Sequence, residues 1–385
     1  MDLRSLPNGL TPAQRCTERR RMIEEETGSD LSALAITDER TASAEEKNCE
    51  QMLGAVPIPV GYAGPLAVHF SDATQADIHL PLATTEGALV ASVNRGCKAL
   101  WMSGGVHVSS EYIGITRSLA FKVNGRESPS ENIRSMENEW KQIVEGSSSH
   151  LKLLRYDLDE RDGYIFLTLA CDTDEAMGMN MITIAGQALG EWLQERIPEL
   201  RFVTVAGNVD SDKKPSVRTH DHGRGYRVTA EADISEEILR TILKSDAQAM
   251  LDVAEAKLTI GSSLAGAIGK NLHAANIIAA LYLATGQDAA HVVEGSLADT
   301  DVSLTGNSLH IRVHLPAVIV GVRGGGTGLP AQEQCRNLLL SPETTLKPVV
   351  QLAQSIGAAV LAGELSLLAA QASHTLAKAH RELGR

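Results

Sequence analysis

The sequence predicts an α+β fold with more than one domain. Strand-like segments occupy parts of the first half of the chain, and the residues after Ser216 carry mainly helical patterns. Between residues 118 and 206, short strand patterns alternate with at least one helical pattern, which is typical of a compact α+β insertion. With 385 residues, of which 43% are hydrophobic, the chain is long enough for two or three domains.

The first predicted element is a polar, helical arm over residues 1 to about 50. Thr11–Thr27 has helical spacing, and Pro12 stands in the first turn, where proline is best tolerated. The basic run Arg19–Arg21 is followed by the acidic run Glu24–Glu26. We expect these charges to pair with one another along a solvated helix face.

The core elements follow the arm. Residues 56–66 are apolar but rich in Pro and Gly, which excludes a long helix and predicts an extended segment at a sheet edge. Residues 309–315 alternate apolar and polar side chains, which predicts a half-buried strand. The other expected strands are Ile78–Leu80 and Tyr164–Ala170, and the expected helices are Met181–Ile197, Ile234–Leu258, Ala274–Thr285 and Pro348–Glu382.

Composition narrows the class of protein. The formal net charge of −13 argues against general binding to nucleic acid or to an anionic membrane. No uninterrupted apolar run is long enough to span a membrane, and the N-terminus does not resemble a signal peptide. The five cysteines are scattered and include no Cys-x-x-Cys pair, so we expect no disulfide framework and no metal site. These features predict a cytoplasmic protein.

Glu86 is a lone carboxylate between an apolar strand-like run and an alanine-rich helix. Burial there would raise its pKa and make it a proton donor near neutral pH. The alternative is that Thr84, Thr85 and Glu86 cap the helix, and this segment alone favours the cap.

Two further segments carry charges in unusual places. Gly207–Pro215 holds two carboxylates and two ammonium groups in a loop that can present Lys213 to a developing oxyanion, although an ordinary solvated turn is the default interpretation. Asp288 follows an apolar helix that ends at Gly286, where a carboxylate is unfavourable unless it has a partner. A structural Asp bonded to nearby backbone is the alternative.

Two segments are suited to phosphate groups. Asp174–Met181 comes directly after a strand and directly before a helix, where free N–H groups favour an anion, and the alternative is a helix start buried in the core. Gly324–Gly328 lets a ligand approach the backbone closely, as many glycine-rich turns without ligands also would. His374 and His380 lie near the C-terminus, where surface or packing roles are commoner than catalysis.

The order and spacing of these motifs closely resemble the catalytic portion of class I 3-hydroxy-3-methylglutaryl-CoA (HMG-CoA) reductase. The resemblance extends from about Glu50 to His380. Its matching blocks are Pro57–Gly61, Ala83–Gly87, Ala176–Met181, Asp212–Pro215, His273–Asn276, Gly286–Asp288, Gly324–Thr327 and Gly363–Ser366.

The resemblance implies a division of the chain into a helical arm, a large α/β substrate domain and an inserted ferredoxin-like domain that binds NADP. The implied ranges are 1–50 for the arm, 51–117 and 216–385 for the large domain, 118–206 for the insertion and 207–215 for the catalytic lysine loop. It also implies a homodimer or a dimer-based higher oligomer with shared active sites.

The implied reaction is the four-electron reduction of HMG-CoA to mevalonate and CoA by NADPH, for isoprenoid synthesis. Such a reaction needs a cation over the carbonyl oxygen and proton sources for that oxygen and for the departing thiolate. By resemblance these groups are Lys213, Glu86 and His380, and Asp288 belongs to the network around the first two. Glu86 and Asp288 close together would raise the pKa of one of them.

The resemblance also implies three sets of binding residues. The acyl end of the substrate is expected at Arg117, Asp212, Lys214 and Lys257, and the CoA and thioester portions at Ser92, Asn94, Arg95, His273 and Asn276. The cofactor is expected at Ser148, Glu175, Met177, Gly178, Met179, Asn180, Met181, Gly324, Gly325, Gly326 and Thr327.

Three departures from the family pattern bear on binding. Ala206 replaces a serine before Gly-Asn, and Glu175 replaces an aspartate before Ala-Met-Gly. The segment Ser148–His150 lacks the arginine that favours a 2′-phosphate, for which Lys152 or Arg385 are substitutes.

NADPH remains the expected cofactor after these departures. The alternatives are an NADH-preferring or mevalonate-oxidising form of the enzyme, or another CoA-thioester oxidoreductase on the same scaffold. A non-catalytic relative ranks last, because all four catalytic groups are present in the sequence.

Overall fold

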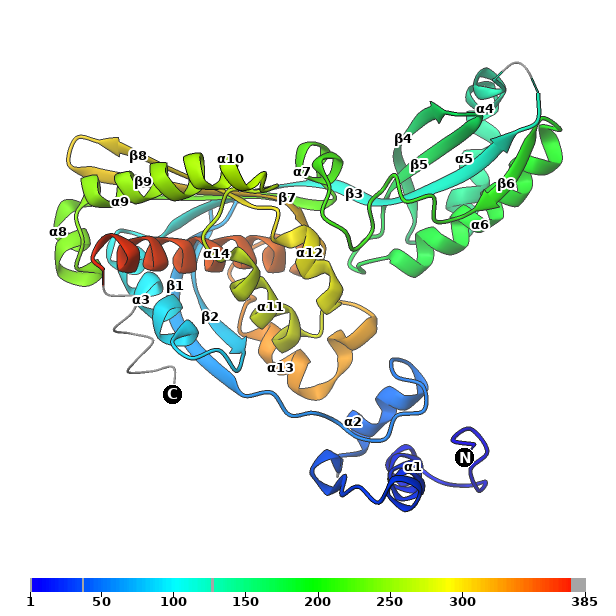
Figure 1. Cartoon of the computed structure of the whole chain (residues 1–385), viewed down its shortest axis with the longest axis horizontal. Helices are drawn as coiled ribbons and strands as arrows, with labels where there is room; N and C mark the ends of the chain where they lie inside the picture. The colour runs from blue at the N-terminus through cyan, green and yellow to red at the C-terminus, as the bar shows by residue number, and fades with distance from the viewer. Residues whose placement is uncertain (1, 37, 126–127, 375–385) are drawn as a thin grey trace.

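The computed structural model describes residues 2–36, 38–125 and 128–374 and contains two sheets that share one strand. The large sheet has the strand order β2-β1-β3-β7-β9-β8, and helices cover one of its faces (Figure 1). The strands are β1 Val60–His69, β2 Gln75–Ala83, β3 Val106–Val123, β4 Lys152–Arg161, β5 Tyr164–Asp172, β6 Leu200–Thr204, β7 Gly225–Ile234, β8 Asp299–Thr305 and β9 Ser308–Val318.

Short helical turns alternate with a few long helices. The α-helices are α1 Pro12–Thr27, α2 Glu39–Ala42, α3 Leu89–Met102, α4 Ser130–Ser135, α5 Glu137–Gly146, α6 Met179–Arg196, α7 Val217–His222, α8 Glu236–Ile238, α9 Ala247–Ala254, α10 Ser262–Ala265, α11 Ala274–Thr285, α12 Val292–Gly295, α13 Pro330–Asn337 and α14 Pro348–Ala372. The 3-10 turns are η1 Ser32–Leu34, η2 Ser43–Glu46, η5 Ala289–His291 and η6 Gly325–Gly328, and the π-helical turns are η3 Leu239–Leu243 and η4 Glu255–Gly261.

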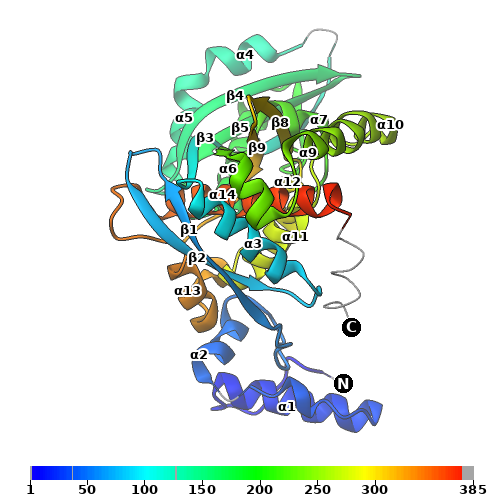
Figure 2. The same cartoon turned by 90° about the vertical axis from the view of Figure 1, so that its left-hand side faces the viewer.

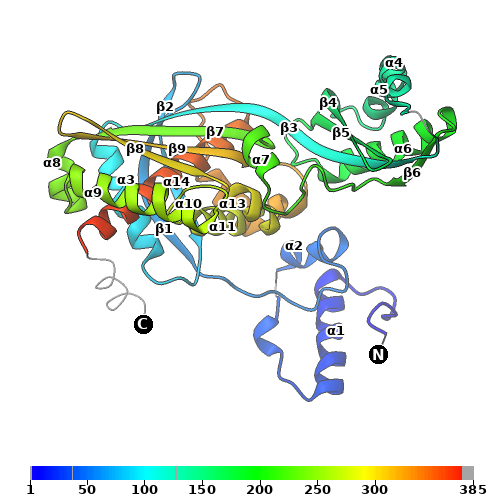
Figure 3. The same ribbon diagram turned by 45° about the horizontal axis from the view of Figure 1, so that its top comes forward.

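Strand β3 belongs to both sheets, and Figure 3 shows it passing from one into the other. Its first half pairs with β7, and its second half pairs with β5 and β6. The small sheet therefore has the order β4-β5-β3-β6, with α4 and α5 before β4 and α6 before β6. This is the β-α-β-β-α-β pattern of a ferredoxin-like unit. The predicted α+β fold is confirmed.

Helix α14 forms the centre of the large core. Nearly all of its side chains are buried, and Gly96 of α3 crosses it so closely that a Cβ there would lie 1.9 Å from the Ala362 carbonyl oxygen. By length and composition α14 is also the one described helix that is long and apolar enough to cross a membrane, and 94% of its most apolar window is buried inside the molecule. Expected helix residues beyond 374 lie outside the described residues.

The N-terminal arm stands apart from the sheets (Figure 2). Thr11 caps α1, and Gln14 completes the capping box, so the predicted helix start is confirmed. Arg21 pairs with neighbouring glutamates along the helix, as expected. Arg19 is a correction: it is only 5% exposed and binds Glu45 at 2.6 Å, because α1 folds back against η2.

The expected helix Ile234–Leu258 is a second correction. Ile234 ends strand β7, and the helical run after it is broken at Lys244, which has a φ of 56°. Helix α9 then restarts with the Asp246 side chain accepting the Ala249 N–H. The apolar spacing correctly indicated helical structure, but the left-handed backbone at Lys244 and the Asp246 cap divide the expected helix in two. The other expected strands and helices, from Ile78–Leu80 to the start of α14, are found within the structure.

Candidate functional site

Lys213 and Asp288 form an ion pair, with 2.8 Å between Lys213 Nζ and Asp288 Oδ2. Asp288 precedes η5 and accepts the Ala290 N–H through its other oxygen, so the catalytic and the structural interpretations of this residue are both compatible with its contacts. Burial raises the pKa of Asp288, but the Lys213 ammonium and the Ala290 N–H outweigh burial and hold the pKa below its usual value.

The backbone at Lys213 is held in a left-handed conformation. Its φ is 57°, which is unfavourable for a residue with a side chain, and its N–H donates to Glu294 Oε1 at 2.6 Å. Glu294 is fully buried on α12. The loop is therefore fixed by a buried carboxylate and presents its ammonium group at the surface, where the Lys213 side chain is 43% exposed.

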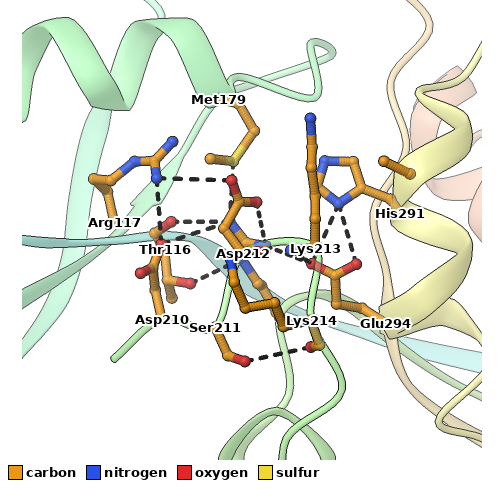
Figure 4. A network of polar contacts seen from close by, with 12 residues as sticks. Thr116, Arg117, Met179, Asp210, Ser211, Asp212, Lys213, Lys214, His291 and Glu294 are labelled. Atoms are coloured by element: carbon orange, nitrogen blue, oxygen red, sulfur yellow. Dashed lines mark hydrogen bonds and ion pairs between the residues drawn. The ribbon is translucent and has the colours of Figure 1, made fainter. Parts of the chain in front are cut away.

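A buried guanidinium, Arg224, joins the loop to the strands below it. Arg224 is 1% exposed, and its Nη1 lies 2.9 Å from both Glu294 Oε1 and Asp212 Oδ1. The same side chain donates to the hydroxyl and carbonyl of Thr116 on β3. Figure 4 shows Asp212, Thr116 and Glu294 converging from the loop, β3 and α12.

Arg117 extends this network toward the small sheet. Its Nη1 lies 3.7 Å from carboxylate oxygens of both Asp210 and Asp212, and its Nη2 donates to Thr183 on α6. Burial raises the pKa of Asp210, whereas for Asp212 the nearby Arg224 overcomes burial and lowers the pKa. Both carboxylates thus lie within ion-pair distance of two guanidinium groups, those of Arg117 and Arg224.

Asp212, His291 and Glu294 offer ligand atoms within 4.8 Å of one another, an arrangement that some metal sites use. Arg224 Nη1, however, already lies 2.9 Å from two of the three residues. The guanidinium supplies the positive charge that the carboxylates require, so the cluster is an ion-pair network rather than an open set of metal ligands.

Glu86 lies at a second, more exposed place, between β2 and α3. Its Oε1 accepts the Asn276 side-chain N–H at 3.2 Å, and its own N–H donates to Thr84 Oγ1. The capping interpretation is wrong, because Ala88 is the N-cap of α3 and no side chain caps this helix. The expected burial of Glu86 is also not provided by this chain, in which the residue is exposed.

The residues expected at CoA and the thioester cluster beside Glu86. Ser92 and Arg95 bind Ser366 of α14, and burial lowers the pKa of Arg95. His273 Nε2 lies 2.9 Å from the Gly363 carbonyl oxygen. Asn94 accepts the Gly64 N–H and so anchors β1.

Helix α11 separates these two places, which we call the Lys213 end and the Glu86 end. Asn276 lies in its first turn, and Asp288 lies just beyond its last residue, Thr285. The helical rise from residue 276 to residue 285 corresponds to roughly 14 Å. Among the described residues no hydrogen bond or ion pair joins Glu86 to Lys213 or Asp288. The expected crowding of Glu86 against Asp288 is therefore absent within one chain.

The expected cofactor residues form a third group, in which α6 begins beside the triglycine turn. Glu175 accepts from Arg323 at 3.2 Å, and its carbonyl accepts the Val322 N–H. Gly178 has a φ of 84°, and a Cβ there would collide with Thr173, so this helix start requires glycine. Ser148 contacts Met181 at 3.5 Å. One surface therefore brings together Ser148 and the segments 174–181 and 321–327.

Three residues expected at the substrate or the cofactor are not placed with the others. Lys257 lies on the π-helical turn η4, and among the described residues no ion pair joins it to the carboxylates of the lysine loop. His380 and Arg385 lie outside the described residues.

The residues that sequence reasoning missed are mostly buried charges or neighbours of the expected motifs. Arg224 stands between two glycines, and Glu294 and His291 follow Asp288 in an otherwise apolar stretch, so isolated charges in apolar surroundings were the available signal. The missed residues are Asp210, Arg224, His291, Glu294, Arg323 and Lys347.

Comparison with known proteins gives one consistent match. Residues 15–385 match the family model described as hydroxymethylglutaryl-coenzyme A reductase. The 3-hydroxy-3-methylglutaryl-coenzyme A reductase of Methanocaldococcus jannaschii is 38% identical, with 95% of this chain and 92% of the relative covered. The Aeropyrum pernix protein of the same name is 40% identical, with 95% and 89% covered. A class II reductase from Streptococcus pneumoniae, solved with NADPH, has a TM-score of 0.66 at 21% identity, with 92% and 96% covered, which shows likeness of fold.

Proposed function

The chain belongs to the hydroxymethylglutaryl-coenzyme A reductase family, and we propose that it reduces HMG-CoA to mevalonate and CoA with two equivalents of NADPH. The observation that carries this function is the Lys213–Asp288 pair, an ammonium group presented at the surface by a loop that a buried carboxylate fixes. A fixed cation of this kind stabilises the negative charge that develops on a carbonyl oxygen when a thioester or an aldehyde is reduced.

Lys213 is proposed to hold its ammonium over the reacting oxygen, with Asp288 keeping it oriented. Glu86 is proposed to give the proton to that oxygen, and the Asn276 amide fixes one oxygen of its carboxyl group. By the family resemblance, His380 protonates the departing thiolate. These four residues together account for stabilisation of the oxyanion and for both proton transfers.

Because α11 keeps Glu86 and Lys213 apart within one chain, we infer that two copies share each site. The exposed Glu86 end of one copy would then meet the Lys213 end of the other, which would bury Glu86 and provide the neighbours that raise its pKa. A homodimer, or a higher oligomer built from dimers, follows from this arrangement.

The acyl end of the substrate is proposed to bind Arg117, Asp212, Lys214 and Lys257. Arg117 is buried and already faces two carboxylates, so a substrate carboxylate would exchange for one of them. Because Ala206 stands in place of a serine, it offers no side-chain hydrogen bond to that carboxylate. We therefore expect Arg117 to contribute more to binding the carboxylate. CoA is proposed to lie along Ser92, Asn94, Arg95 and His273.

The third group of residues fits a dinucleotide with phosphates. No side chain caps α6, and a Cβ at Gly324 or Gly325 would meet no atom within 4 Å, so backbone N–H groups and open surface lie together. Arg323 and Lys347 add two largely exposed cations, at 77% and 64% side-chain exposure. When bound, NADPH supplies hydride. Met177, Met179, Asn180, Met181, Gly326 and Thr327 complete the proposed contacts.

Finer assignments follow the same resemblance. We propose the class I form of the enzyme, a cytoplasmic location, and a division in which residues 118–206 carry the cofactor and the sheet of residues 51–117 and 216–385 carries the substrate. The motif set supports the class, and identity to the class II structure is only 21%.

The direct test mixes the purified protein with HMG-CoA and NADPH and follows the nicotinamide absorbance. We expect it to fall, with mevalonate and CoA as products, and to fall more slowly with NADH. No oxidation of either cofactor would refute the proposed activity.

Mixing two inactive variants tests the shared site. Glu86→Gln and Lys213→Met each disable every site alone, but a mixed dimer keeps one site with both native groups. Random mixing should restore about a quarter of the wild-type rate if sites are shared. Mixed dimers without activity would place Glu86 and Lys213 of the same chain in one site.

A further inference from the structure

His291 is a buried imidazole beside the catalytic pair. It is 0% exposed, and its Nδ1 lies 3.4 Å from both carboxylate oxygens of Glu294. Its Nε2 faces Asp288 Oδ2 at 3.8 Å and has no hydrogen-bond partner in the described structure. Figure 4 shows the ring directed at Glu294 beside the Lys213 side chain. A buried polar atom without a partner is uncommon and requires an explanation.

The carboxylate whose position His291 can control is Asp288. Asp288 Oδ2 lies 2.8 Å from Lys213 Nζ and 3.8 Å from His291 Nε2. Glu294, which orients the imidazole, also accepts the Lys213 N–H, so the ring and the lysine loop share one buried anchor.

Charges surround His291 on every element packed against it. Asp288 just before η5 and Glu294 on α12 flank it, and Asp212 of the lysine loop contributes a third negative charge. Arg224 places a cation 2.9 Å from Glu294. Tyr282 of α11 places a buried hydroxyl near Glu294.

We propose that His291, protonated on both ring nitrogens between Glu294 and Asp288, is a positioning residue that faces Asp288 with a second positive charge beside that of Lys213, so that Asp288 stays ionised and in place when Lys213 turns its ammonium toward the substrate oxygen. The proton remains on Nε2 throughout, and no bond to hydrogen is broken. Without His291, an Asp288 that shares the Lys213 ammonium with the substrate would take up a proton more readily and cease to hold Lys213. This role rests on the proposed reductase function.

Kinetics of three variants test the role. His291→Phe keeps the shape of the ring but removes both nitrogens, whereas His291→Gln retains one N–H. We expect the Phe variant to lose kcat by on the order of ten- to a hundredfold with little change in KM for HMG-CoA, and the Gln variant to recover part of the loss. The control is His310→Gln, which removes a histidine of β9 that pairs with Asp233 of β7 at 3.0 Å.

The pH profile gives a readout that a purely structural role would not move. Loss of His291 raises the pKa of Asp288, so the acid limb of kcat should move to higher pH in His291→Phe and stay unchanged in His310→Gln. If the Phe variant does not fold, His291→Asn, which is too short to reach both carboxylates, carries the same expectation.

A measurement without substrate separates this inference from the proposed function. In ligand-free protein labelled with 13C-carboxyl aspartate, the Asp288 signal, assigned with Asp288→Asn, should titrate at higher pH in His291→Phe. An unmoved titration, or an unmoved kcat and acid limb, would overturn the role of His291. Wild-type protein that oxidises no cofactor would instead refute the reductase function, while the titration still decides the contact.

Discussion

The Lys213 end and the Glu86 end of the candidate site are built in opposite ways. At the Lys213 end, Arg224 and Glu294 are almost completely buried and hold the loop through contacts of 2.6 to 2.9 Å. At the Glu86 end, one hydrogen bond of 3.2 Å from Asn276 orients an exposed carboxylate.

This difference shows which half of the site a single chain can organise. Buried charges have few alternative partners, so their geometry is fixed as soon as the core forms. An exposed carboxylate is solvated and keeps several orientations, so its final position depends on whatever covers it. The proposed second copy therefore matters far more to Glu86 than to Lys213.

The largest expected effect comes from Glu86→Gln. We expect kcat to fall by about 10²- to 10⁴-fold because the proton donor is lost, while HMG-CoA binding, measured by calorimetry, is retained. Glu343→Gln, in an exposed loop, is the matched control. Unchanged turnover would show that Glu86 is not the proton donor and that the exposed end takes no part in catalysis.

Arg224→Met should have the largest effect on stability. It leaves Glu294 and Asp210 buried without their shared cation, which we expect to lower the free energy of unfolding by about 3–5 kcal/mol. Asn276→Ala removes one hydrogen bond at the exposed end and should cost about 1 kcal/mol or less. Equal losses of unfolding free energy for the two variants in denaturant titrations would contradict the proposed difference between the two ends.

Lys213→Met tests whether the buried anchor serves an exposed function. We expect kcat to fall by about 10²- to 10³-fold, as for loss of an oxyanion contact. The free energy of unfolding should change little, because the side chains of Lys213 and Asp288 are 43% and 34% exposed. A large loss of stability with a small loss of kcat would show that Lys213 has a structural role rather than a catalytic one.

The smallest effect is the acid dependence of the Lys213–Asp288 pair. The folded-state pKa of Asp288 is lowered, so its contribution to stability is present above the unfolded value of about 3.9 and is lost as pH falls through the folded value. Wild type should thus exceed Asp288→Asn in stability at pH 6, and the gap should close in stronger acid. Thermal melting from pH 6 to pH 3 measures this, and a gap independent of pH would contradict the pairing.

Sequence patterns were most reliable where a local rule applied. Helix α11 has the expected bounds Ala274–Thr285, and Thr11 with Pro12 marks the start of α1. The motif spacing also identified Lys213 and Asp288 as candidates, and these two residues are in contact. The cap at Thr84–Glu86 failed because Ala88 takes a left-handed conformation, and the chain turns into α3 without a side-chain cap.

The sequence by itself determined the α+β fold, the family resemblance and the candidate residues, because periodicity, turn chemistry and motif order are local properties. Only the tertiary structure brought Arg224 to Glu294, 70 residues later in the chain, and placed His291 between two carboxylates. It also separated Glu86 from Lys213 by the length of α11. Ion pairs between distant segments depend on which faces the core buries, and no local pattern encodes that choice.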